Sequence, residues 1–458
     1  MNAPTDSLPP DQHNTSMDVL EIQPIDRFCC RIRPPGSKSL TNRALVISAL
    51  ADGRSELINT LDSEDTQVMI ESWKRLGVPV EQRKEDGRVL LLGCGGQLPA
   101  PSADLFLANS GTSMRFLAAA AALGHGVFRL DGVARMRERP IEGLLAALRD
   151  LGADAESEWR TGCPPVLIRA SGLRGGMVRI SGEESSQYVS ALLMAAPYAN
   201  REVHIEILGE LVSEPFVQMT VRVMEDFGVV VQRSEPHNYL VPAGQCYRAR
   251  TYEIEPDATA ASYFWAAAAI TGGEVTIEGL GQSSVQGDVS FVDLLEQMGA
   301  QVTRREKSIT VSGRASRGIR ADMNAISDTA LTLAVVAAFA DGPTTIHNIA
   351  HIRRQETDRI HAVATELNRI GAHVSEHSDG LSIVPAPLHG ARIETYNDHR
   401  MAMSFALVGL RVSGILISNP ACTGKTYPRF FSDLRRLSAE SLTTVLDATY
   451  DSAPRSHG

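Results

Sequence analysis

The sequence predicts an α/β (α+β) fold of two similar domains, each made of three copies of a β-α-β-α-β-β unit, with a ligand cleft between the domains. Two regularities carry this prediction. Helical patterns end in a glycine and a strand-like run, at Gly77, Gly152, Gly228, Gly299 and Gly371, which lie 75, 76, 71 and 72 residues apart. A second series of helix starts recurs at about the same period. Such a period indicates a repeated unit, and it is too long for a typical solenoid.

The segment before each glycine has the spacing of an amphipathic helix. In the second copy, Ile141, Leu144, Leu145, Leu148 and Leu151 fall on one helical face. The glycine that follows suits the left-handed position just beyond a helix end. Each copy therefore predicts a helix, a glycine that ends it, and a strand.

Another helix start lies about forty residues before each glycine, where small polar residues precede a run rich in alanine and leucine. The six starts are Ser37–Arg43, Asn109–Arg115, Ser185–Gln187, Asp257–Thr259, Ser327–Thr329 and Asn397–Arg400. They define six copies, three for each domain. The sixth copy is expected to close with a helix over Phe430–Leu437.

Composition and charge exclude several classes of function. The 458 residues are 43% hydrophobic and 21% charged, with a net charge of −10, which argues against general nucleic-acid or membrane-surface binding. The longest apolar stretches, near Ala261–Ile270 and Thr329–Ala340, are too short to cross a bilayer and are interpreted as buried helices. Residues 1–17 are polar, contain prolines and have no arginine, so they predict a disordered leader rather than a signal or transit peptide.

The cysteines do not suggest a metal site. They are Cys29, Cys30, Cys94, Cys163, Cys246 and Cys422, and none forms a CxxC pair. Without a secretion signal they are interpreted as reduced thiols of a cytoplasmic protein.

The helix starts carry positively charged residues in addition to the residues that can cap a helix. A helix N-terminus presents free N–H groups and a partial positive charge, and it can bind an anion. Serine, threonine, asparagine and aspartate at these places are explained by capping alone, but the cations beside them are not. These cations are Lys38, Arg43, Arg115, Arg139, Arg353, Arg354, Arg359, His399, Arg400 and Lys425. They predict a ligand with several negative charges, such as phosphates and carboxylates.

Two carboxylates accompany the cations. Asp328 opens an apolar helix, where it could serve as an N-cap, and Glu356 could form an i,i+3 ion pair with Arg359. Alternatively, both could transfer protons in a site crowded with cations.

The motifs at these positions resemble one family. They are PPGSKSLTNRAL, NSGTSMRFLAAA, RMRERPIEGL, ESSQYVSALLMAAP, LVSEPF, DATAASYFWAAAA, ISDTALTLAVVA, RQETDRI, TYNDHRMAMSFAL and CTGKTYPRFF. From about Ile22 to Glu440 the chain resembles the 3-phosphoshikimate 1-carboxyvinyltransferases, also called 5-enolpyruvylshikimate-3-phosphate synthases.

The resemblance implies an activity and an architecture. Members transfer the enolpyruvyl group of phosphoenolpyruvate to the 5-hydroxyl of 3-phosphoshikimate and release phosphate, on the route to chorismate and aromatic amino acids. It implies no metal and no organic cofactor, and a monomer that closes one site within one chain. The implied domains are 18–36 plus 257–445, a domain inserted at 37–256, and a tail at 446–458.

The resemblance also implies roles for individual residues. Those expected to bind 3-phosphoshikimate are Lys38, Ser39, Arg43, Ser185, Ser186, Gln187, Ser213, Asp328 and Gln355. Those expected to bind phosphoenolpyruvate are Lys38, Gly111, Arg139, Gln187, Arg359, Arg400 and Lys425. Asp328 would accept the proton of the attacking hydroxyl, and Glu356, with Lys38, would handle protons at the methylene carbon.

The chain departs from the common family pattern at four positions. Gln355 replaces a lysine and His351 an asparagine near the acceptor's phosphate, which should weaken that contact unless Arg353 or Arg354 compensates. Phe216 stands where a tyrosine hydroxyl is expected, and Phe116 stands where proline is common. These differences bear on single substrate contacts rather than on the reaction.

Two alternatives remain at this stage. One is the sister transferase that acts on UDP-N-acetylglucosamine, which relies on a cysteine in a mobile loop; no cysteine of this chain has a comparable setting. The other is a non-catalytic binding protein with the same fold, which Lys38, Asp328, Glu356 and Arg400 together argue against. Gly111 further implies sensitivity to glyphosate, which occupies the phosphoenolpyruvate position.

Overall fold

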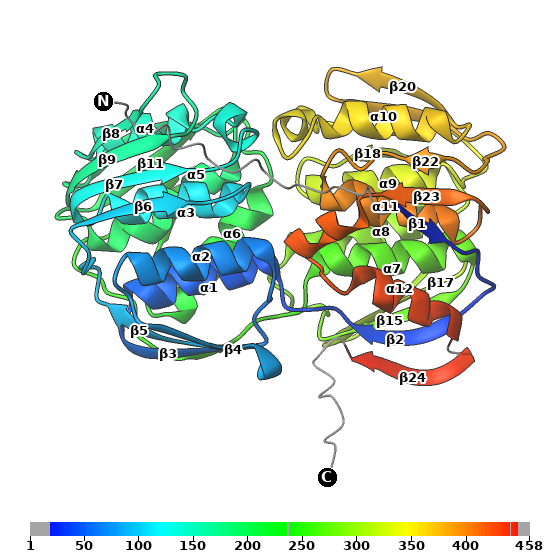
Figure 1. Ribbon diagram of the computed structural model, residues 1–458, viewed down its shortest axis with the longest axis horizontal. Helices are drawn as coiled ribbons and strands as arrows, with labels where there is room; N and C mark the ends of the chain where they lie inside the picture. Colours follow the sequence, from blue (N-terminus) through cyan, green and yellow to red (C-terminus); the bar gives the residue numbers. More distant parts are fainter. Residues whose placement is uncertain (1–18, 236–237, 440, 448–458) are drawn as a thin grey trace, which may run out of the picture.

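The chain folds into two halves that lie side by side (Figure 1). The computed structural model describes residues 19–235, 238–439 and 441–447; the predicted leader and residues 448–458 of the predicted tail lie outside these ranges. One hydrophobic core is built from residues between Leu40 and Ile254, and the other from residues 22–32 together with 258–437. In the sequence, the residues of the two cores are separated near Gly36 and Pro256.

The two segments that connect the halves are paired with each other. Gly36 and Pro256 form an antiparallel bridge. The Ser37 N–H donates to the Glu255 carbonyl at 2.8 Å, and the Asp257 N–H donates to the Pro35 carbonyl at 2.8 Å. The connection between the halves is therefore a short two-stranded strap.

Three units are continuous in sequence and share one topology. The second unit contains β6 (Ser102–Phe106), α3 (Gly111–Ala121), β7 (His125–Asp131), α4 (Glu142–Asp150), β8 (Asp154–Ser157) and β9 (Val166–Ser171). The third contains β10 (Gly176–Ser181), α5 (Ser186–Ala195), β11 (Val203–Leu208), α6 (Glu214–Asp226), β12 (Gln232–Glu235) and β13 (Asn238–Val241). The fifth contains β18 (Arg320–Asp322), α9 (Ala330–Ala337), β19 (Thr344–His347), α10 (Arg359–Arg369), β20 (His373–His377) and β21 (Gly380–Val384). In each sheet the first two strands are parallel, and the fourth strand lies between the second and the third. The predicted β-α-β-α-β-β unit is confirmed in these copies.

Two further units borrow their first strand from a distant part of the chain. The first contains α1 (Lys38–Leu50), β3 (Asp52–Ile58), α2 (Glu64–Arg75), β4 (Val80–Arg83) and β5 (Arg88–Cys94), and its first strand is β14 (Thr251–Glu253). The fourth contains α7 (Ala258–Thr271), β15 (Glu274–Glu278), α8 (Phe291–Gln297), β16 (Gln301–Arg304) and β17 (Ser308–Ser312), and its first strand is β2 (Cys29–Arg33). In each half, one sheet therefore contains a strand that directly precedes the strap, β14 in the first unit and β2 in the fourth.

The sixth unit departs from the predicted pattern. It contains β22 (Arg392–Ile393), α11 (His399–Gly409), β23 (Ile415–Ser418) and α12 (Phe430–Ala439). No hairpin of its own follows α12 within the described residues. Instead β1 (Val19–Ile22) pairs antiparallel with β23, where the fourth strand lies in the other units, and β24 (Ser441–Asp447) joins β2. The start of the described chain therefore completes the last unit.

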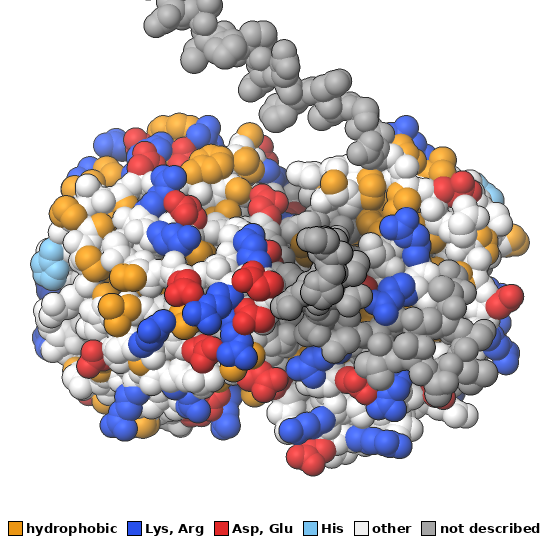
Figure 2. All heavy atoms as spheres, turned by 60° about the horizontal axis from the view of Figure 1, so that its bottom comes forward, with side chains coloured by type: hydrophobic (Ala, Val, Ile, Leu, Met, Phe, Trp, Pro, Cys, Tyr) orange, Lys and Arg blue, Asp and Glu red, His pale blue; other side chains and the backbone are white. Residues whose placement is uncertain are grey.

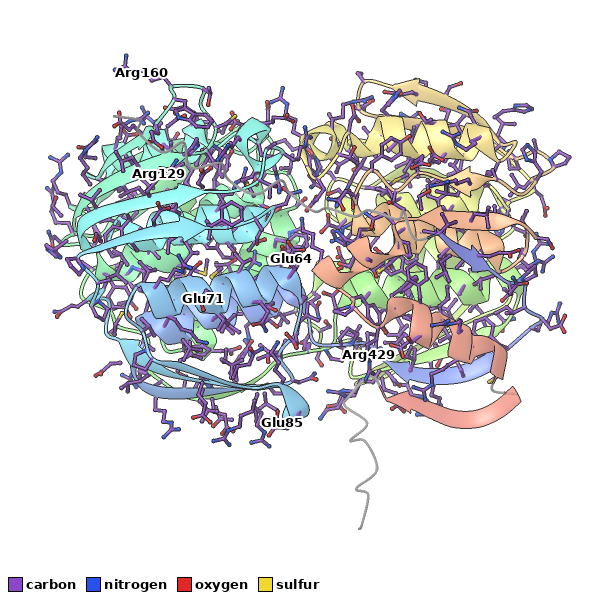
Figure 3. The ribbon with its side chains drawn as sticks, in the orientation of Figure 1. Glu64, Glu71, Glu85, Arg129, Arg160 and Arg429 are labelled. Atoms are coloured by element: carbon purple, nitrogen blue, oxygen red, sulfur yellow. The ribbon has the colours of Figure 1, made fainter. Side chains whose placement is uncertain are left out.

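The predicted helix ends are confirmed by the backbone. The five periodic glycines, Gly77, Gly152, Gly228, Gly299 and Gly371, have φ values of 88°, 98°, 85°, 108° and 103°. These values lie in the left-handed region, which L-residues with a Cβ rarely adopt. The helices that they end are amphipathic, and Figure 3 shows Glu64 and Glu71 along the outer side of α2.

The second series of helices is buried over most of its length. These helices are α1, α3, α5, α7, α9 and α11. Ser37, Ser110, Ser185, Asp257 and Asp398 accept a backbone N–H as N-caps of five of them. The sixth, α9, follows a 3₁₀ turn over Ser327–Thr329 and has no side-chain cap. Capping therefore does not explain Asp328.

The surface shows no extended region of one charge on the face seen in Figure 2, where basic and acidic side chains alternate over the described residues. Among those residues, no helix has both the length and the apolar character needed to span a membrane.

Candidate active site

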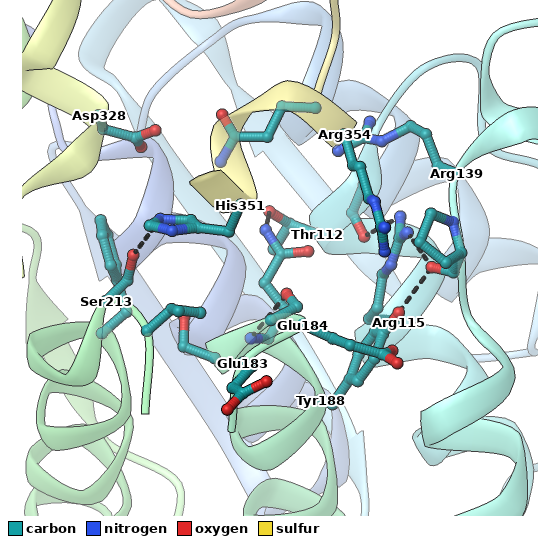
Figure 4. Close-up of a pocket in the computed structure, with 18 of the residues that line it drawn as sticks. Thr112, Arg115, Arg139, Glu183, Glu184, Tyr188, Ser213, Asp328, His351 and Arg354 are labelled. Carbon is teal, nitrogen blue, oxygen red and sulfur yellow. Dashed lines mark hydrogen bonds between the residues drawn. The ribbon is translucent and has the colours of Figure 1, made fainter. Parts of the chain in front are cut away.

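A cleft of about 680 Å³ lies between the halves and is lined by both of them. It collects every residue to which the family resemblance gave a role, except Lys425. The lining members of that set are Lys38, Ser39, Arg43, Gly111, Arg139, Ser185, Ser186, Gln187, Ser213, Asp328, Gln355, Glu356, Arg359 and Arg400. Lys425 is buried behind this wall, where its Nζ donates to Glu356. Figure 4 shows Asp328 and Ser213 on one side of the pocket and Arg139 and Arg115 on the other.

The repeat itself brings these residues together. The starts of α1, α3 and α5 contribute from one half, and the turn before α9 and the start of α11 contribute from the other. Equivalent helix starts in different copies thus point into one cleft. Because their free N–H groups and partial positive charges converge, the backbone alone makes the cleft suited to anions; the cationic side chains add to this effect.

Asp328 is held by two arginines. Arg400 donates to its Oδ2 at 2.6 Å, and Arg359 donates to its Oδ1 at 3.2 Å. Burial alone would raise the pKa of Asp328, but the positive charges of Arg400, Arg359 and Lys38 outweigh it and lower the pKa below the usual value. The carboxylate is therefore ionised and can accept a proton.

Glu356 is held in the same way. Lys425 donates to its Oε1 at 2.8 Å, and Arg359 donates to its Oε2 at 2.9 Å. Burial opposes ionisation, but Lys425, Arg359 and Arg139 outweigh it and hold the pKa of Glu356 well below its usual value. The i,i+3 pair expected from the sequence exists, and the carboxylate also has a partner from a distant segment. An anionic ligand that draws off these cations would raise the pKa of both carboxyl groups towards the range useful for proton transfer.

The halves contact each other around the cleft. Lys425 Nζ donates to the Asn109 carbonyl at 3.0 Å, and Arg135 Nη2 donates to the Gln355 carbonyl at 3.0 Å. On the other side, the Ser213 N–H donates to the Asn324 carbonyl at 3.2 Å. These contacts join segments of different halves on two sides of the cleft.

Arg139 lies directly against Gly111. Its Nη1 donates to the Asn109 carbonyl at 3.1 Å. A Cβ atom placed on Gly111 would lie 2.3 Å from Arg139 Nη2 and 2.8 Å from its Cζ. The absence of a side chain at Gly111 is thus what allows the guanidinium to lie over the start of α3.

Arg43 lies against Phe116 and Phe216, two of the residues that depart from the expected family pattern. Its guanidinium carbon lies 5.2 Å from the centre of the Phe116 ring and 5.8 Å from that of Phe216. Its Nε donates to Thr220 Oγ1 at 2.7 Å. Aromatic rings at this range attract a guanidinium, so the two phenylalanines help to hold Arg43 in place.

A third departure, His351, lies beside Ser213, where the acceptor's phosphate was expected. Ser213 Oγ lies 3.2 Å from Ser327 Oγ and 3.4 Å from His351 Nε2. Burial lowers the pKa of His351 to about 4, so its ring is neutral at pH 7. Arg353 does not compensate for the missing charge, because it donates to the Asp358 carboxylate at 2.9 Å and to Glu376 at 2.7 Å.

Several lining residues were not found by sequence reasoning. They include Glu183, Glu184, Glu210, Asn324 and Asn348. The position of Glu183 and Glu184 directly before the SSQ helix start was an available signal. Glu210 lies in one loop, and Asn324 and Asn348 lie in loops more than a hundred residues further along the chain. No local sequence pattern predicts that these three residues line the cleft.

Asp288 is a buried carboxyl group beside this site. Thr259 Oγ1 donates to its Oδ2, whereas its Oδ1 has no hydrogen-bond partner among the described residues. It borders a small cavity that also touches Ser39 and Phe216, which line the cleft. Burial, and next the negative charge of Asp328, raise the pKa of Asp288 to about 7.

Asp288→Asn is expected to stabilise the protein at pH 8 but hardly at pH 4. In the unfolded chain this carboxyl loses its proton near pH 4, and in the folded chain it does so near pH 7. Stability is therefore lost as the pH rises between these values, and the full penalty, about 4 kcal/mol at most, is present above them. The amide keeps an acceptor for Thr259. Urea unfolding of the variant at both pH values tests this, with the exposed Asp341→Asn as control; an equal effect at pH 4 and pH 8 contradicts it.

The fold and the site define an enzyme with two three-unit halves and a polycationic cleft that holds two partly buried, ionised carboxylates. The family described as EPSP synthase (3-phosphoshikimate 1-carboxyvinyltransferase) matches residues 22–434 by its sequence model, and the chain belongs to this family. The resemblance inferred from the motifs is thereby confirmed.

Individual relatives agree with this assignment. The chain is 47% identical over 418 residues to 3-phosphoshikimate 1-carboxyvinyltransferase of Nostoc punctiforme, covering 91% of this chain and 98% of the relative. It is 48% identical over 436 residues to the chloroplastic enzyme of the same name from Arabidopsis thaliana, covering 91% and 84%. A solved structure of EPSP synthase from Acinetobacter baumannii superposes with a TM-score of 0.78 at 28% identity, covering 92% of this chain and 98% of that one. The predicted fold class and the enzyme class are both confirmed.

Proposed function

We propose that this chain transfers the enolpyruvyl group of phosphoenolpyruvate to the 5-hydroxyl of 3-phosphoshikimate, giving 5-enolpyruvylshikimate 3-phosphate and phosphate, in the shikimate route to aromatic amino acids. One observation carries the proposal: Arg359 lies between two ionised carboxylates, Asp328 and Glu356, in the wall of a cleft lined by cations from both halves. This is the arrangement needed for two proton transfers next to highly anionic ligands.

Phosphoenolpyruvate is assigned to the side of the cleft with the most positive charge. Arg139, Arg359, Arg400 and Lys425 meet there, next to the start of α3 at Gly111. The phosphate and carboxylate of this donor would take the place of protein carboxylates as partners of these cations. 3-Phosphoshikimate is assigned to the part of the cleft that is lined by hydroxyl groups at Ser39, Ser185, Ser186 and Ser213 and by Gln187 and Gln355.

The proton steps follow from the two carboxylates. A proton from Glu356 or Lys38 adds to the methylene carbon of the donor, and the 5-hydroxyl oxygen attacks the adjacent carbon while its own proton goes to Asp328. The tetrahedral adduct then returns a methyl proton to the group that donated it and expels phosphate, so the double bond is restored. The departing phosphate takes up the proton held by Asp328. The closed cleft holds both substrates in position and limits access of water.

Phosphate release from phosphoenolpyruvate tests the proposal. The purified chain is incubated with the donor and with 3-phosphoshikimate, with UDP-N-acetylglucosamine, or with no acceptor. Release only with 3-phosphoshikimate is expected. Release with UDP-N-acetylglucosamine would assign the chain to the sister reaction, and no release with either acceptor would favour a binding protein. None of the six cysteines is among the described residues that line the cleft, which argues against the sister reaction.

Gly111→Ala is expected to weaken inhibition by glyphosate by about 10- to 100-fold and to raise KM for phosphoenolpyruvate. The new methyl group would displace the Arg139 guanidinium, which lies 2.3 Å from the Cβ position, and the loss of one charge-assisted hydrogen bond has an effect of this size. Inhibition constants and KM values of both proteins measure the change. Equal inhibition constants would contradict the expectation.

We also propose that the enzyme acts as a monomer in the cytoplasm, with domains divided at 36/37 and 256/257. The separate hydrophobic cores on either side of the strap support the division. A site lined by residues of both halves of one chain supports the monomer, and sedimentation of the purified protein tests it.

A further inference from the structure

Ser213, at the start of α6, has a backbone conformation that is unusual for a residue with a side chain. Its φ is 52° and its ψ is 41°, in the left-handed region. This conformation is unfavourable for serine and persists only where surrounding contacts hold it. Among the described residues, none of the N–H groups of α6 donates to its side chain, so helix capping does not explain it. The conformation therefore has to be maintained by contacts from elsewhere in the chain.

Asn324 of the other half supplies such contacts. The Ser213 N–H donates to both the carbonyl oxygen and the side-chain Oδ1 of Asn324, each at 3.2 Å. The Ser213 hydroxyl lies 3.5 Å from the same carbonyl oxygen, and Figure 4 shows it facing His351. Ser213 and Asn324 are both buried, and both line the cleft. A residue of one half thus fixes the backbone of a cleft-lining residue in the other half.

Asn324 is itself fixed by hydrogen bonds that lead back to the first half. Its backbone N–H donates to Asp322 Oδ1 at 2.9 Å, and its Nδ2 donates to Asn348 Oδ1 at 3.3 Å. Asn348 Nδ2 donates in turn to Asp322 Oδ2 and to Glu210 Oε1, each at 3.1 Å. Glu210 lies three residues before Ser213. Two asparagines of the second half therefore hold both ends of this short segment of the first.

The Ser213 hydroxyl can exchange its present contacts for a ligand. Its distances to Asn324 O, Ser327 Oγ and His351 Nε2 are 3.5, 3.2 and 3.4 Å, whereas a strong O–H···O bond is about 2.7–2.8 Å long. A hydrogen bond from the hydroxyl to a charged oxygen would be shorter and stronger than these contacts. Such a bond requires that the backbone of Ser213 presents the hydroxyl to the cleft.

We propose that Asn324 is a positioning residue for acceptor recognition, which holds Ser213 so that its hydroxyl can donate to the 3-phosphate of the acceptor. This inference rests on the proposed function, which assigns 3-phosphoshikimate to the part of the cleft that Ser213 lines. Because Asn324 and Ser213 belong to different halves, the site for this phosphate is complete only where the two halves are in contact.

The test compares Asn324→Ala, Ser213→Ala and the double variant with the wild-type full-length enzyme. Calorimetric titration gives Kd for 3-phosphoshikimate and for shikimate, which lacks the phosphate, and steady-state phosphate release gives KM for phosphoenolpyruvate. Asn200→Ala is the matched control, because that asparagine is exposed and is not among the described residues that line the cleft. Asn348→Gly is a second probe, because glycine readily adopts the φ of 62° found there and removes the side chain that links Asn324 to Glu210.

Ser213→Ala is expected to weaken 3-phosphoshikimate binding about 10- to 100-fold, and Asn324→Ala about five- to tenfold. The double variant should bind within about twofold of Ser213→Ala, because a residue that acts through the Ser213 hydroxyl has nothing left to position. Shikimate binding and KM for phosphoenolpyruvate should change less than about twofold, because neither uses this hydrogen bond. Asn348→Gly should show a smaller loss with the same selectivity, and Asn200→Ala should bind like the wild type.

Additive losses in the double variant, an equal loss for shikimate, or an unchanged Kd for 3-phosphoshikimate in Asn324→Ala would each overturn the inference and leave the proposed function standing. Loss of folding in both Asn324→Ala and Asn348→Gly, measured by urea unfolding, would assign these asparagines a structural role and overturn the inference as well. A wild-type enzyme that does not bind 3-phosphoshikimate would overturn both the inference and the proposed function.

Discussion

Asp328→Ala is expected to lower kcat about 10²- to 10⁴-fold, the usual contribution of a positioned general base. The ionised carboxylate is the proposed acceptor of the hydroxyl proton, and no other described carboxylate takes its position between Arg400 and Arg359. The fold should remain, because Arg359 keeps its contacts with Glu356 and Asp398. Steady-state phosphate release and thermal unfolding measure the two effects.

Two further variants separate the loss of the base from other effects. Asp328→Asn keeps the size of the side chain and an acceptor for Arg400, and it should be nearly as inactive as the alanine variant because an amide does not accept the proton. Asp341→Ala removes an exposed aspartate beyond the other end of α9 and should leave kcat unchanged. Turnover of Asp328→Ala within about fivefold of the wild type would refute the assignment of Asp328 as base.

Arg359→Met is expected to destabilise the protein by about 3–5 kcal/mol and to abolish measurable turnover. Its side chain is 1% exposed and pairs with Asp398 at 2.8 Å, Glu356 at 2.9 Å and Asp328 at 3.2 Å. Its removal leaves Asp398, whose side chain is fully buried, without a compensating charge. Urea unfolding at pH 7 measures the change.

The effect of Arg359→Met should depend on pH. Arg359 helps to hold the pKa values of Asp328 and Glu356 low. A lowered carboxyl pKa stabilises the folded state above the pKa of the unfolded chain, and this stabilisation is lost as the pH falls. The deficit of the variant should therefore be larger at pH 7 than at pH 4. Arg179→Met on β10 is the control and should cost less than about 1 kcal/mol, because that arginine and its partner Glu206 are 65% and 39% exposed. A loss below about 1 kcal/mol for Arg359→Met would contradict the expected cost of an unpaired buried charge.

The features that were predictable from the sequence depend on local backbone geometry. A glycine such as Gly77 or Gly371 ends a helix because a positive φ is needed there, whatever surrounds it. Ser37 and Asp257 cap helices because their side chains reach N–H groups only three residues away. For the same reason the period of the repeat, the order of its elements and the two series of helices could be read directly from the residues.

Other features arise only when distant segments meet. The contact of Lys425 with Glu356 and Asn109 joins three parts of the chain. Arg43 lies between Phe116 and Phe216. The sixth unit takes β1 in place of a hairpin of its own. None of these pairings leaves a local pattern, because each is set by how the units pack.

The sequence by itself determined the repeat, the helix starts, the charged residues on them and, through its motifs, the family. The tertiary structure decided which of those charges are partnered and which groups are ionised. It made Asp328 a carboxylate held by two arginines rather than a helix cap, made His351 neutral, and brought Asn324 against Ser213. The reason is physical: caps and helix ends depend on neighbours a few residues away, whereas burial and Coulomb interactions depend on distances that exist only after the two halves have packed together.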